Sequence, residues 1–330
     1  MNIPALVVVL LCSLLLARGT RESARLNAVM VCVKLSVLVL FVVVAFTAFR
    51  AGHFADFAPH GASGIGVAAS AVFFSYVGFD TVATASEEVR NPRRTIPLAL
   101  LLTLGAVTVL YILVSLAAVG AQPTGRFGAQ ADAGEAVLAE ILRDVTGAGW
   151  PVVLLSAGAV VSIFSVVLVT LYGQTRILFS MARDGLVPEI FRRVDRKRHT
   201  PVGNTWIVGA GVGALAALVP LQYLADLTSM GTLVAFVAVA AAVVVLRRIA
   251  PDAPRPYKVP LYPVVPIVSA ASCLYLAWLL PGITWALFGG WLVLAAALYL
   301  VFGRRHSALR ERAVAHEHAA AEASTTAAQA

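Results

Sequence analysis

Apolar segments long enough to cross a lipid bilayer recur along the whole chain. A membrane-spanning helix needs about 20 mainly apolar residues, because the hydrocarbon layer that it crosses is about 30 Å thick. The segments lie near residues 3–17, 28–49, 65–86, 98–120, 150–179, 202–219, 228–246, 262–280 and 284–302. The sequence therefore predicts an all-α polytopic membrane protein with about nine transmembrane helices.

The composition excludes an ordinary soluble domain. Hydrophobic residues make up 60% of the 330 residues, charged residues 13%, and the mean hydropathy is +0.87. Soluble domains are roughly one-half apolar and one-quarter charged, so a water-soluble fold could not cover this much apolar surface. We expect one transmembrane domain in the lipid bilayer over residues 1–305. The polar segment 306–330 cannot span, and we expect it to be a disordered tail.

The basic residues of the chain follow membrane topology. The sequence carries 25 Lys and Arg against 17 Asp and Glu, a surplus that in a soluble protein would suggest nucleic-acid binding. Here they gather in alternate loops and after the last span, whereas the intervening loops hold Arg50, Arg126 and Arg143. Loops rich in Lys and Arg stay in the cytoplasm. The pattern predicts a cytoplasmic C-terminus, an external Met1 and no nucleic-acid partner.

The sequence shows no catalytic or metal-binding motif. Cys12, Cys32 and Cys273 lie in apolar spans at spacings that fit neither a disulfide framework nor a metal site, so we interpret them as packed residues. GxSxG, HExxH, P-loop and GxGxxG patterns are absent from the printed sequence. We therefore expect no catalytic residues, no metal, no cofactor and a function other than that of an enzyme.

Two ionisable residues within the spans are the first functional candidates, because a charge in hydrocarbon costs several kcal/mol. Lys34 lies about seven residues from the Asn27 end of its span. It is either a lysine that extends its amine to the interface or a functional buried amine. The second candidate, Asp80, lies midway through segment 65–86.

Asp80 follows Gly78 in the run Phe-Phe-Ser-Tyr-Val-Gly-Phe-Asp-Thr over residues 73–81. A glycine followed by polar residues at mid-depth is typical of a discontinuous helix, whose free backbone groups can bind a charged solute. Such backbone is tolerated where it faces protein or a water-filled cavity. The alternative is that Gly78 lets two helices pack closely while Asp80 pairs with a neighbouring hydroxyl. Glu87 and Glu88, at the cytoplasmic exit, are expected to pair with arginines.

The run FFSYVGFDTVATASEEVRNPRRTIP, residues 73–97, resembles the sixth-helix signature of amino acid permeases of the amino acid–polyamine–organocation superfamily, particularly the cationic amino acid transporter-like branch. Four further runs are similar in order and spacing. RESARLNAVMVCVKL resembles the start of helix five, GQTRILFSMARDGLVPEIF the end of helix eight, ADLTSMGTLVAF helix ten and PRPYKVPLYPVVP the start of helix eleven. The resemblance extends from about residue 2 to residue 307.

The resemblance implies a leucine-transporter-type fold, built from two inverted repeats of five helices plus two further helices. In that fold the substrate binds at breaks in helices one and six. The first span of this chain resembles helix four, so helices one to three of the family have no counterpart here. We therefore expect an N-terminally incomplete fold with the equivalents of helices four to twelve.

The resemblance also implies roles for particular residues. The implied substrate-binding set is Phe74, Ser75, Val77, Gly78, Phe79 and Asp80. Backbone carbonyls of the first three would receive the amino group of the substrate. The glycine would permit unwinding, the second phenylalanine would close over the substrate, and the aspartate would start the second half-helix and handle protons or substrate. Lys34 matches a helix-five lysine whose proton exchange would replace a coupling sodium ion.

The leading hypothesis is a secondary active transporter of the cell membrane that moves amino acids, coupled to protons, by alternating access around a broken helix at Gly78. The alternative is a truncated, non-transporting permease remnant or an interaction subunit. The residues do not distinguish cationic from neutral substrates, or symport from antiport.

Overall fold

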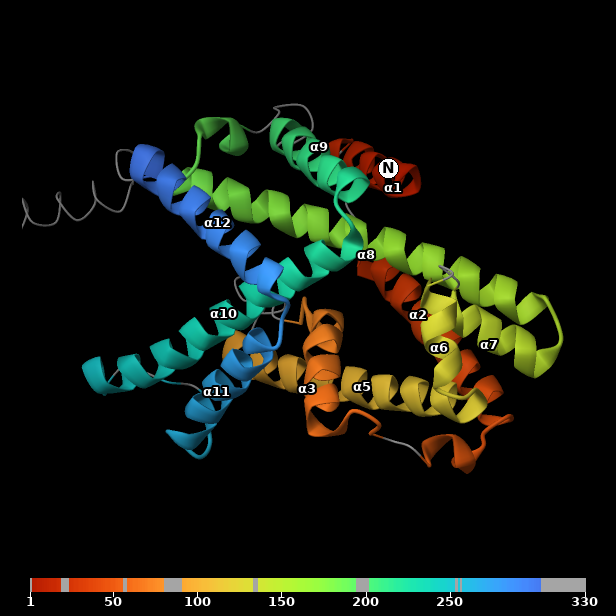
Figure 1. Ribbon diagram of the computed structural model, residues 1–330. Coiled ribbons are helices and arrows are strands. Elements are labelled where there is room, and N and C mark those ends of the chain that lie inside the picture. The colour runs from red at the N-terminus through yellow and green to blue at the C-terminus, as the bar shows by residue number, and fades with distance from the viewer. Residues whose placement is uncertain are drawn as a thin grey trace, which may run out of the picture. The chain divides into compact units, whose positions relative to one another are not determined.

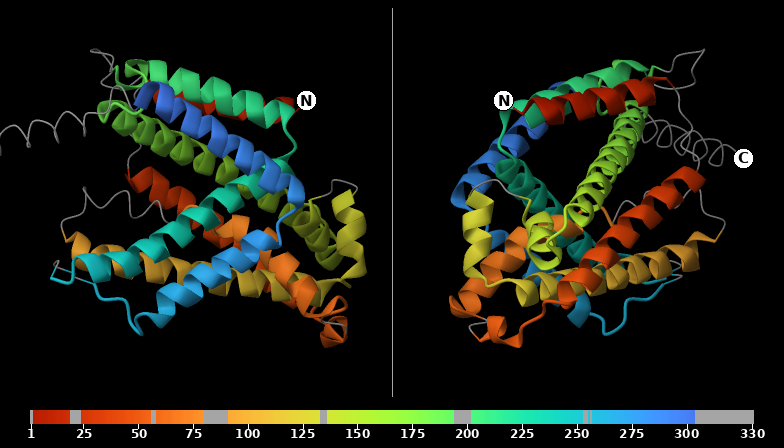
Figure 2. Two further views of the ribbon diagram at one scale, coloured as in Figure 1. Left: turned by 60° about the vertical axis from the view of Figure 1, so that its left-hand side comes forward. Right: turned by 90° about the vertical axis from the view of Figure 1, so that its right-hand side faces the viewer.

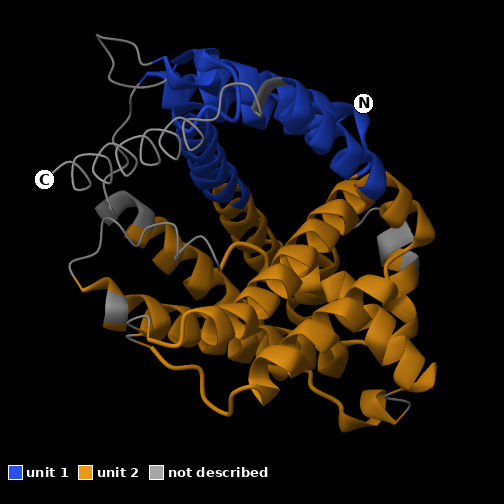
Figure 3. Ribbon diagram, turned by 90° about the vertical axis from the view of Figure 1, so that its left-hand side faces the viewer, with its two compact units in different colours: residues 1–23, 163–220, 289–330 blue, residues 24–162, 221–288 orange. Residues whose placement is uncertain are grey.

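The computed structural model describes residues 2–18, 24–55, 58–79, 91–132, 136–193, 202–252, 255 and 257–303, and every regular element within them is a helix (Figure 1). The chain divides into two compact units (Figure 3). Unit 1 comprises Met1–Ser23, Ile163–Pro220 and Gly289–Ala330, and unit 2 comprises Ala24–Ser162 and Leu221–Phe288. The predicted tail, 306–330, lies outside the described residues.

Each predicted span contains an apolar helix in the described part of the chain. Five are long enough to cross a membrane: most of α2 (Ala24–Phe46) and α5 (Pro92–Ala121), all of α8 (Trp150–Arg183) and α10 (Leu221–Ile249), and α12 (Gly282–Leu298) with its π-helical continuation, Tyr299–Gly303. Four are shorter: α1 (Ile3–Ala17), α3 (Gly61–Val72) extended to Tyr76, α9 (Val202–Leu218) and α11 (Val264–Trp278). The all-helical architecture is thus confirmed for the described residues, and five of the nine predicted spans contain helices long enough to cross a membrane.

The helix α5 begins earlier than the predicted span 98–120. The helix begins at Pro92, directly after Asn91, and Pro97 lies inside it. Proline fits the first helical position because its missing N–H would have no partner there and its φ is already near the helical value. Pro97 therefore interrupts the hydrogen bonding of an existing helix.

In unit 1, α1 and α9 lie side by side and antiparallel (Figure 2). The backbone N–H of Asn2 donates to the carbonyl of Ala217 at 3.1 Å. Glycines on α9 allow the close approach, because a Cβ at Gly209 would overlap with the hydroxyl of Ser13 and one at Gly213 would lie 3.0 Å from Leu6. The core of this unit consists of Val9, Cys12, Leu168, Leu171 and Val208.

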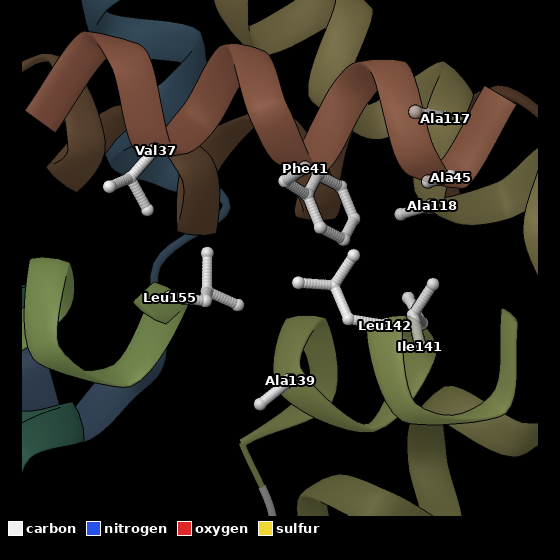
Figure 4. Close-up of a cluster of buried hydrophobic side chains, with 9 residues drawn as sticks. All are labelled: Val37, Phe41, Ala45, Ala117, Ala118, Ala139, Ile141, Leu142 and Leu155. Carbon is white, nitrogen blue, oxygen red and sulfur yellow. The ribbon is translucent and has the colours of Figure 1, made fainter. Parts of the chain in front are cut away.

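One core of unit 2 lies among α2, α5, α7 (Val137–Thr146) and the first turns of α8. Figure 4 shows Phe41 pointing from α2 toward Leu142 of α7. The other members are Val37, Ala45, Ala117, Ala118, Ala139, Ile141 and Leu155. Small residues again allow close packing, since a Cβ at Gly158 would lie 2.8 Å from Val37.

A second core of unit 2 lies between α10 and α11, and Phe73, directly after α3, packs against it. It contains Met230, Leu233, Cys273, Ala277 and Leu280. The hydroxyl of Ser70 on α3 donates to the carbonyl of Leu276 at 3.0 Å. This hydrogen bond attaches the end of α3 to α11, three residues before Phe73.

The cysteines are all free, and two of them are packed as predicted. Cys12 and Cys273 are buried, whereas Cys32 is exposed on α2. The interpretation of Cys32 as a packed residue is therefore wrong within the described chain. Its neighbours Val31 and Val33 are also exposed, as expected for an apolar helix that lipid would surround.

Candidate functional site

The helix that begins with α3 ends inside the predicted span 65–86. It continues from Val72 as a 3₁₀ helix, η2 (Phe73–Tyr76), and the chain then becomes extended at Val77, with φ −62° and ψ 132°. Gly78 follows with φ +112°. The chain therefore leaves its helical path within an apolar segment, at the glycine that the sequence singled out.

Conformation, and not lack of space, favours glycine at position 78. Apart from its chain neighbours, no heavy atom of the described residues lies within 4 Å of the place where a Cβ would be. A φ of +112° is readily adopted by glycine and disfavoured for residues with a Cβ. Glycine at this position therefore allows the backbone to turn. The alternative, that Gly78 lets two helices pack closely, is not supported, because no neighbouring helix among the described residues approaches its Cβ position.

The end of the helix leaves backbone carbonyls without their intrahelical partners. The Phe74 carbonyl accepts the N–H of Val77 at 3.1 Å. The Ser75 carbonyl accepts the hydroxyl of Tyr111, from α5, at 2.8 Å. A carbonyl oxygen has two lone pairs, so each of these oxygens can accept a second donor.

Aromatic rings surround the same segment. The ring of Tyr111 meets that of Tyr76 edge-on, with centroids 5.2 Å apart. Phe236, on α10, contacts Phe73 at 6.3 Å and Phe79 at 5.5 Å. A single side chain of α10 therefore touches aromatic residues on both sides of the turn at Val77 and Gly78.

The structure brings together most of the predicted substrate-binding set. Phe74 and Ser75 are exposed, Val77 and Phe79 are half-buried, and all four lie within six residues of one another. Asp80 lies outside the described residues, as do Glu87 and Glu88, so the second half-helix expected after Gly78 is not described. The site is therefore defined from Phe73 to Phe79.

Lys34 lies on a different part of unit 2. It is half-buried on α2, which packs mainly against α5 and α7 in the described chain, whereas η2 packs against α3 and α10. The grouping of aromatic rings and carbonyls around residues 73–79 does not include it. Both regions nevertheless contact α5, which carries Tyr111.

Sequence reasoning missed Tyr111 and Phe236. A tyrosine within an apolar span was an available signal, since the hydroxyl of a buried tyrosine usually has a hydrogen-bond partner. Phe236 gave no such signal because it is one apolar residue among many on α10.

This arrangement suits the binding of a small cationic group. The C-terminal end of a helix carries partial negative charge, and exposed carbonyl oxygens accept hydrogen bonds from an ammonium group. Among the described residues, no group of three or more His, Cys, Asp or Glu side chains could hold a metal ion.

Comparison of the sequence with known proteins identifies the family of this chain. The sequence profile described as "Amino acid permease" matches residues 3–302. The methylthioribose transporter of Bacillus subtilis (strain 168) is 38% identical over 310 residues, which cover 94% of this chain and 66% of that protein. The branched-chain amino acid permease BcaP of the same organism is 39% identical with the same coverage.

A plant relative is more distant and longer. The vacuolar cationic amino acid transporter 4 of Arabidopsis thaliana is 34% identical over 254 residues, which cover 75% of this chain and 41% of the transporter. The chain spans about two-thirds of the length of its bacterial relatives. The profile match over nearly the whole chain is nevertheless decisive, and this protein belongs to the amino acid permease family.

Proposed function

We propose that this chain is the transmembrane part of a secondary active transporter that moves amino acids across the cell membrane. Membership in a permease family makes the protein a transporter-type membrane protein and not an enzyme. The observation that carries the proposal is the end of a helix inside an apolar segment, at Val77 and Gly78, with carbonyl oxygens that can accept further hydrogen bonds. An open helix end at this depth needs a polar ligand or water.

In this proposal the ammonium group of the substrate binds to the carbonyls of Phe74, Ser75 and Val77. Gly78 provides the turn, Phe79 closes over the substrate, and Asp80 begins the following half-helix. The leucine-transporter-type fold would hold this segment at its centre, and alternating access would expose it to each side in turn. Residues 1–305 form the permease domain, with the C-terminus in the cytoplasm.

The substrate class rests on the relatives and on the chemistry of the helix end. BcaP is named for branched-chain amino acids and the Arabidopsis protein for cationic ones. Both classes share an α-ammonium group, which is the part that backbone carbonyls would recognise. The methylthioribose transporter, whose named substrate is a sugar derivative, supplies a second candidate. We favour an amino acid because the open carbonyls suit a cationic donor.

Coupling to protons is a further part of the proposal. Lys34 is half-buried on an apolar helix. A lysine in such a place can exchange protons during a transport cycle, which supports Lys34 as the coupling residue.

A binding experiment on the purified chain in lipid nanodiscs tests the substrate class. We expect radiolabelled leucine or lysine to bind saturably, while N-acetyl-leucine, which lacks the ammonium group, does not compete. Binding of methylthioribose in place of either amino acid would overturn the assignment. Uptake by the same chain in liposomes then separates a carrier from a remnant, because a non-transporting remnant could bind substrate without moving it.

A further inference from the structure

The hydroxyl of Tyr111 replaces a hydrogen bond that the end of η2 has lost. In a continuous α-helix the carbonyl of Ser75 would accept the N–H of Phe79. Gly78, with φ +112°, directs the chain away from that path. The Tyr111 hydroxyl, 2.8 Å from the Ser75 oxygen, is the donor instead.

Aromatic packing fixes where this hydroxyl can lie. The rings of Tyr111 and Tyr76 meet at an interplanar angle of 77°. Edge-to-face contacts of this kind are favourable and directional. The residue next to Ser75 therefore orients the tyrosine that binds the Ser75 carbonyl, and α5 is attached to η2 by two contacts of different chemistry.

An oxygen held by one donor keeps a defined direction for its second lone pair. A hydroxyl donates one hydrogen bond and a carbonyl oxygen accepts two. Without Tyr111, the Ser75 carbonyl would lose this donor, and the end of η2 would be held less firmly. With Tyr111 in place, that oxygen stays outside the intrahelical pattern.

We propose that Tyr111 is a positioning residue for substrate, which holds the Ser75 carbonyl so that its remaining lone pair can accept the substrate ammonium. This inference rests on the proposed function, because it assigns a partner to the carbonyl that the ammonium is proposed to contact. The predicted substrate-binding set comes entirely from residues 74–80 and does not include this tyrosine. Its role is to prepare the site from a neighbouring helix.

Hydrogen exchange tests the structural half of the proposal without any substrate. In lipid nanodiscs, Tyr111→Phe keeps the ring contact and removes the hydroxyl. We expect exchange in peptides covering residues 73–79 to rise about fivefold, as loss of one hydrogen bond would predict. Tyr76→Phe is the matched control, because its hydroxyl makes no hydrogen bond with the described residues. Equal exchange in the two variants would overturn the proposal.

Ligand selectivity tests the second half. Leucine and its 2-hydroxy analogue differ in the ammonium group, whose hydrogen bonds to a carbonyl are charge-assisted and stronger. Tyr111→Phe should weaken leucine binding about fivefold while changing the affinity for the 2-hydroxy acid less than twofold. Equal weakening for both ligands would indicate a general structural role and overturn the positioning role.

The two measurements separate failure of this inference from failure of the proposed function. If the wild-type chain binds no amino acid, the proposed function is wrong, whereas the exchange data still decide whether Tyr111 holds the end of η2. If leucine binds and Tyr111→Phe changes neither its affinity nor the exchange, the inference is wrong and the proposed function stands.

Discussion

The rings of Phe79 and Phe236 lie with their centroids 5.5 Å apart, so that α10 contacts the first aromatic residue after Gly78. The same Phe236 ring meets Phe73 edge-on. The turn at Val77 and Gly78 is therefore bridged by a side chain from another helix. Any movement of Phe79 relative to Phe73 must change its contact with Phe236.

The Phe79 to Phe236 contact predicts that Phe236→Leu weakens substrate binding. Leucine keeps an apolar side chain and removes an aromatic pair, which is worth about 0.5–1.5 kcal/mol beyond its buried area. We expect leucine affinity to fall about threefold to tenfold in an equilibrium binding assay. Val239→Ala, at a 60% exposed position on the same helix, is the control. Identical affinities for the two variants would contradict a role for Phe236 in holding Phe79.

The contact of α1 with α9 predicts that alanine substitution destabilises the protein at Gly209 but not at Gly211. Gly209→Ala would place a methyl group against Ser13, whereas no other part of the described structure lies within 4 Å of a Cβ at Gly211. Overpacking costs about 1–3 kcal/mol. Thermal unfolding in detergent should therefore occur at a lower temperature for Gly209→Ala than for wild type, and Gly211→Ala should not lower it. A lower temperature for Gly211→Ala alone would show that the α1–α9 packing is wrong.

The hydrogen bonds of Asn204 should stabilise the segment that follows α8. Its buried side-chain amide donates to the carbonyls of Thr175 at 2.8 Å and Phe191 at 3.2 Å. Asn204→Ala removes both bonds and leaves two carbonyls to find other partners, at a cost of about 1–3 kcal/mol. We expect faster tryptic cleavage after Arg192 and Arg193. Gln174→Ala, on the exposed face of α8, should cleave at the wild-type rate.

The proposed role of Lys34 predicts a change in pH dependence. In a protein that transports, Lys34→Ala should abolish the stimulation of amino acid uptake by an inward proton gradient, because no amine remains to exchange a proton. Membrane insertion should be unchanged, as judged by the yield of folded protein. Lys258→Ala, at an exposed position after α10, should keep the stimulation. If a proton gradient still stimulated uptake by Lys34→Ala, Lys34 could not be the residue that couples transport to protons.

The sequence predicted the helical segments well, because each depends on the local distribution of apolar residues. It also predicted a departure from helix at Gly78, where the backbone has φ +112°. The helix α5 begins at Pro92, before the predicted span 98–120, because a span defined by its apolar residues leaves out the polar first turn of the helix.

The contacts between helices could not be predicted in the same way. Tyr111 and Ser75 are 36 residues apart in sequence, and nothing in the sequence around either residue indicates that the two are in contact. Phe236 meets Phe79 because α10 packs beside η2, which no periodicity reveals. The resemblance to permeases supplied the predicted substrate-binding set, which is Phe74, Ser75, Val77, Gly78, Phe79 and Asp80. The residues of other helices that contact this set could be identified only from the fold.

Equilibrium binding of radiolabelled leucine and lysine to Gly78→Ala tests the central claim, that the turn at this glycine forms the substrate site. A Cβ has room at this position, so the substitution challenges the backbone conformation alone, at a cost of about 1–3 kcal/mol. We predict about tenfold or greater loss of affinity, whereas Gly105→Ala, which also has open space around its Cβ position on α5, binds like wild type. Wild-type affinity in Gly78→Ala would contradict the account.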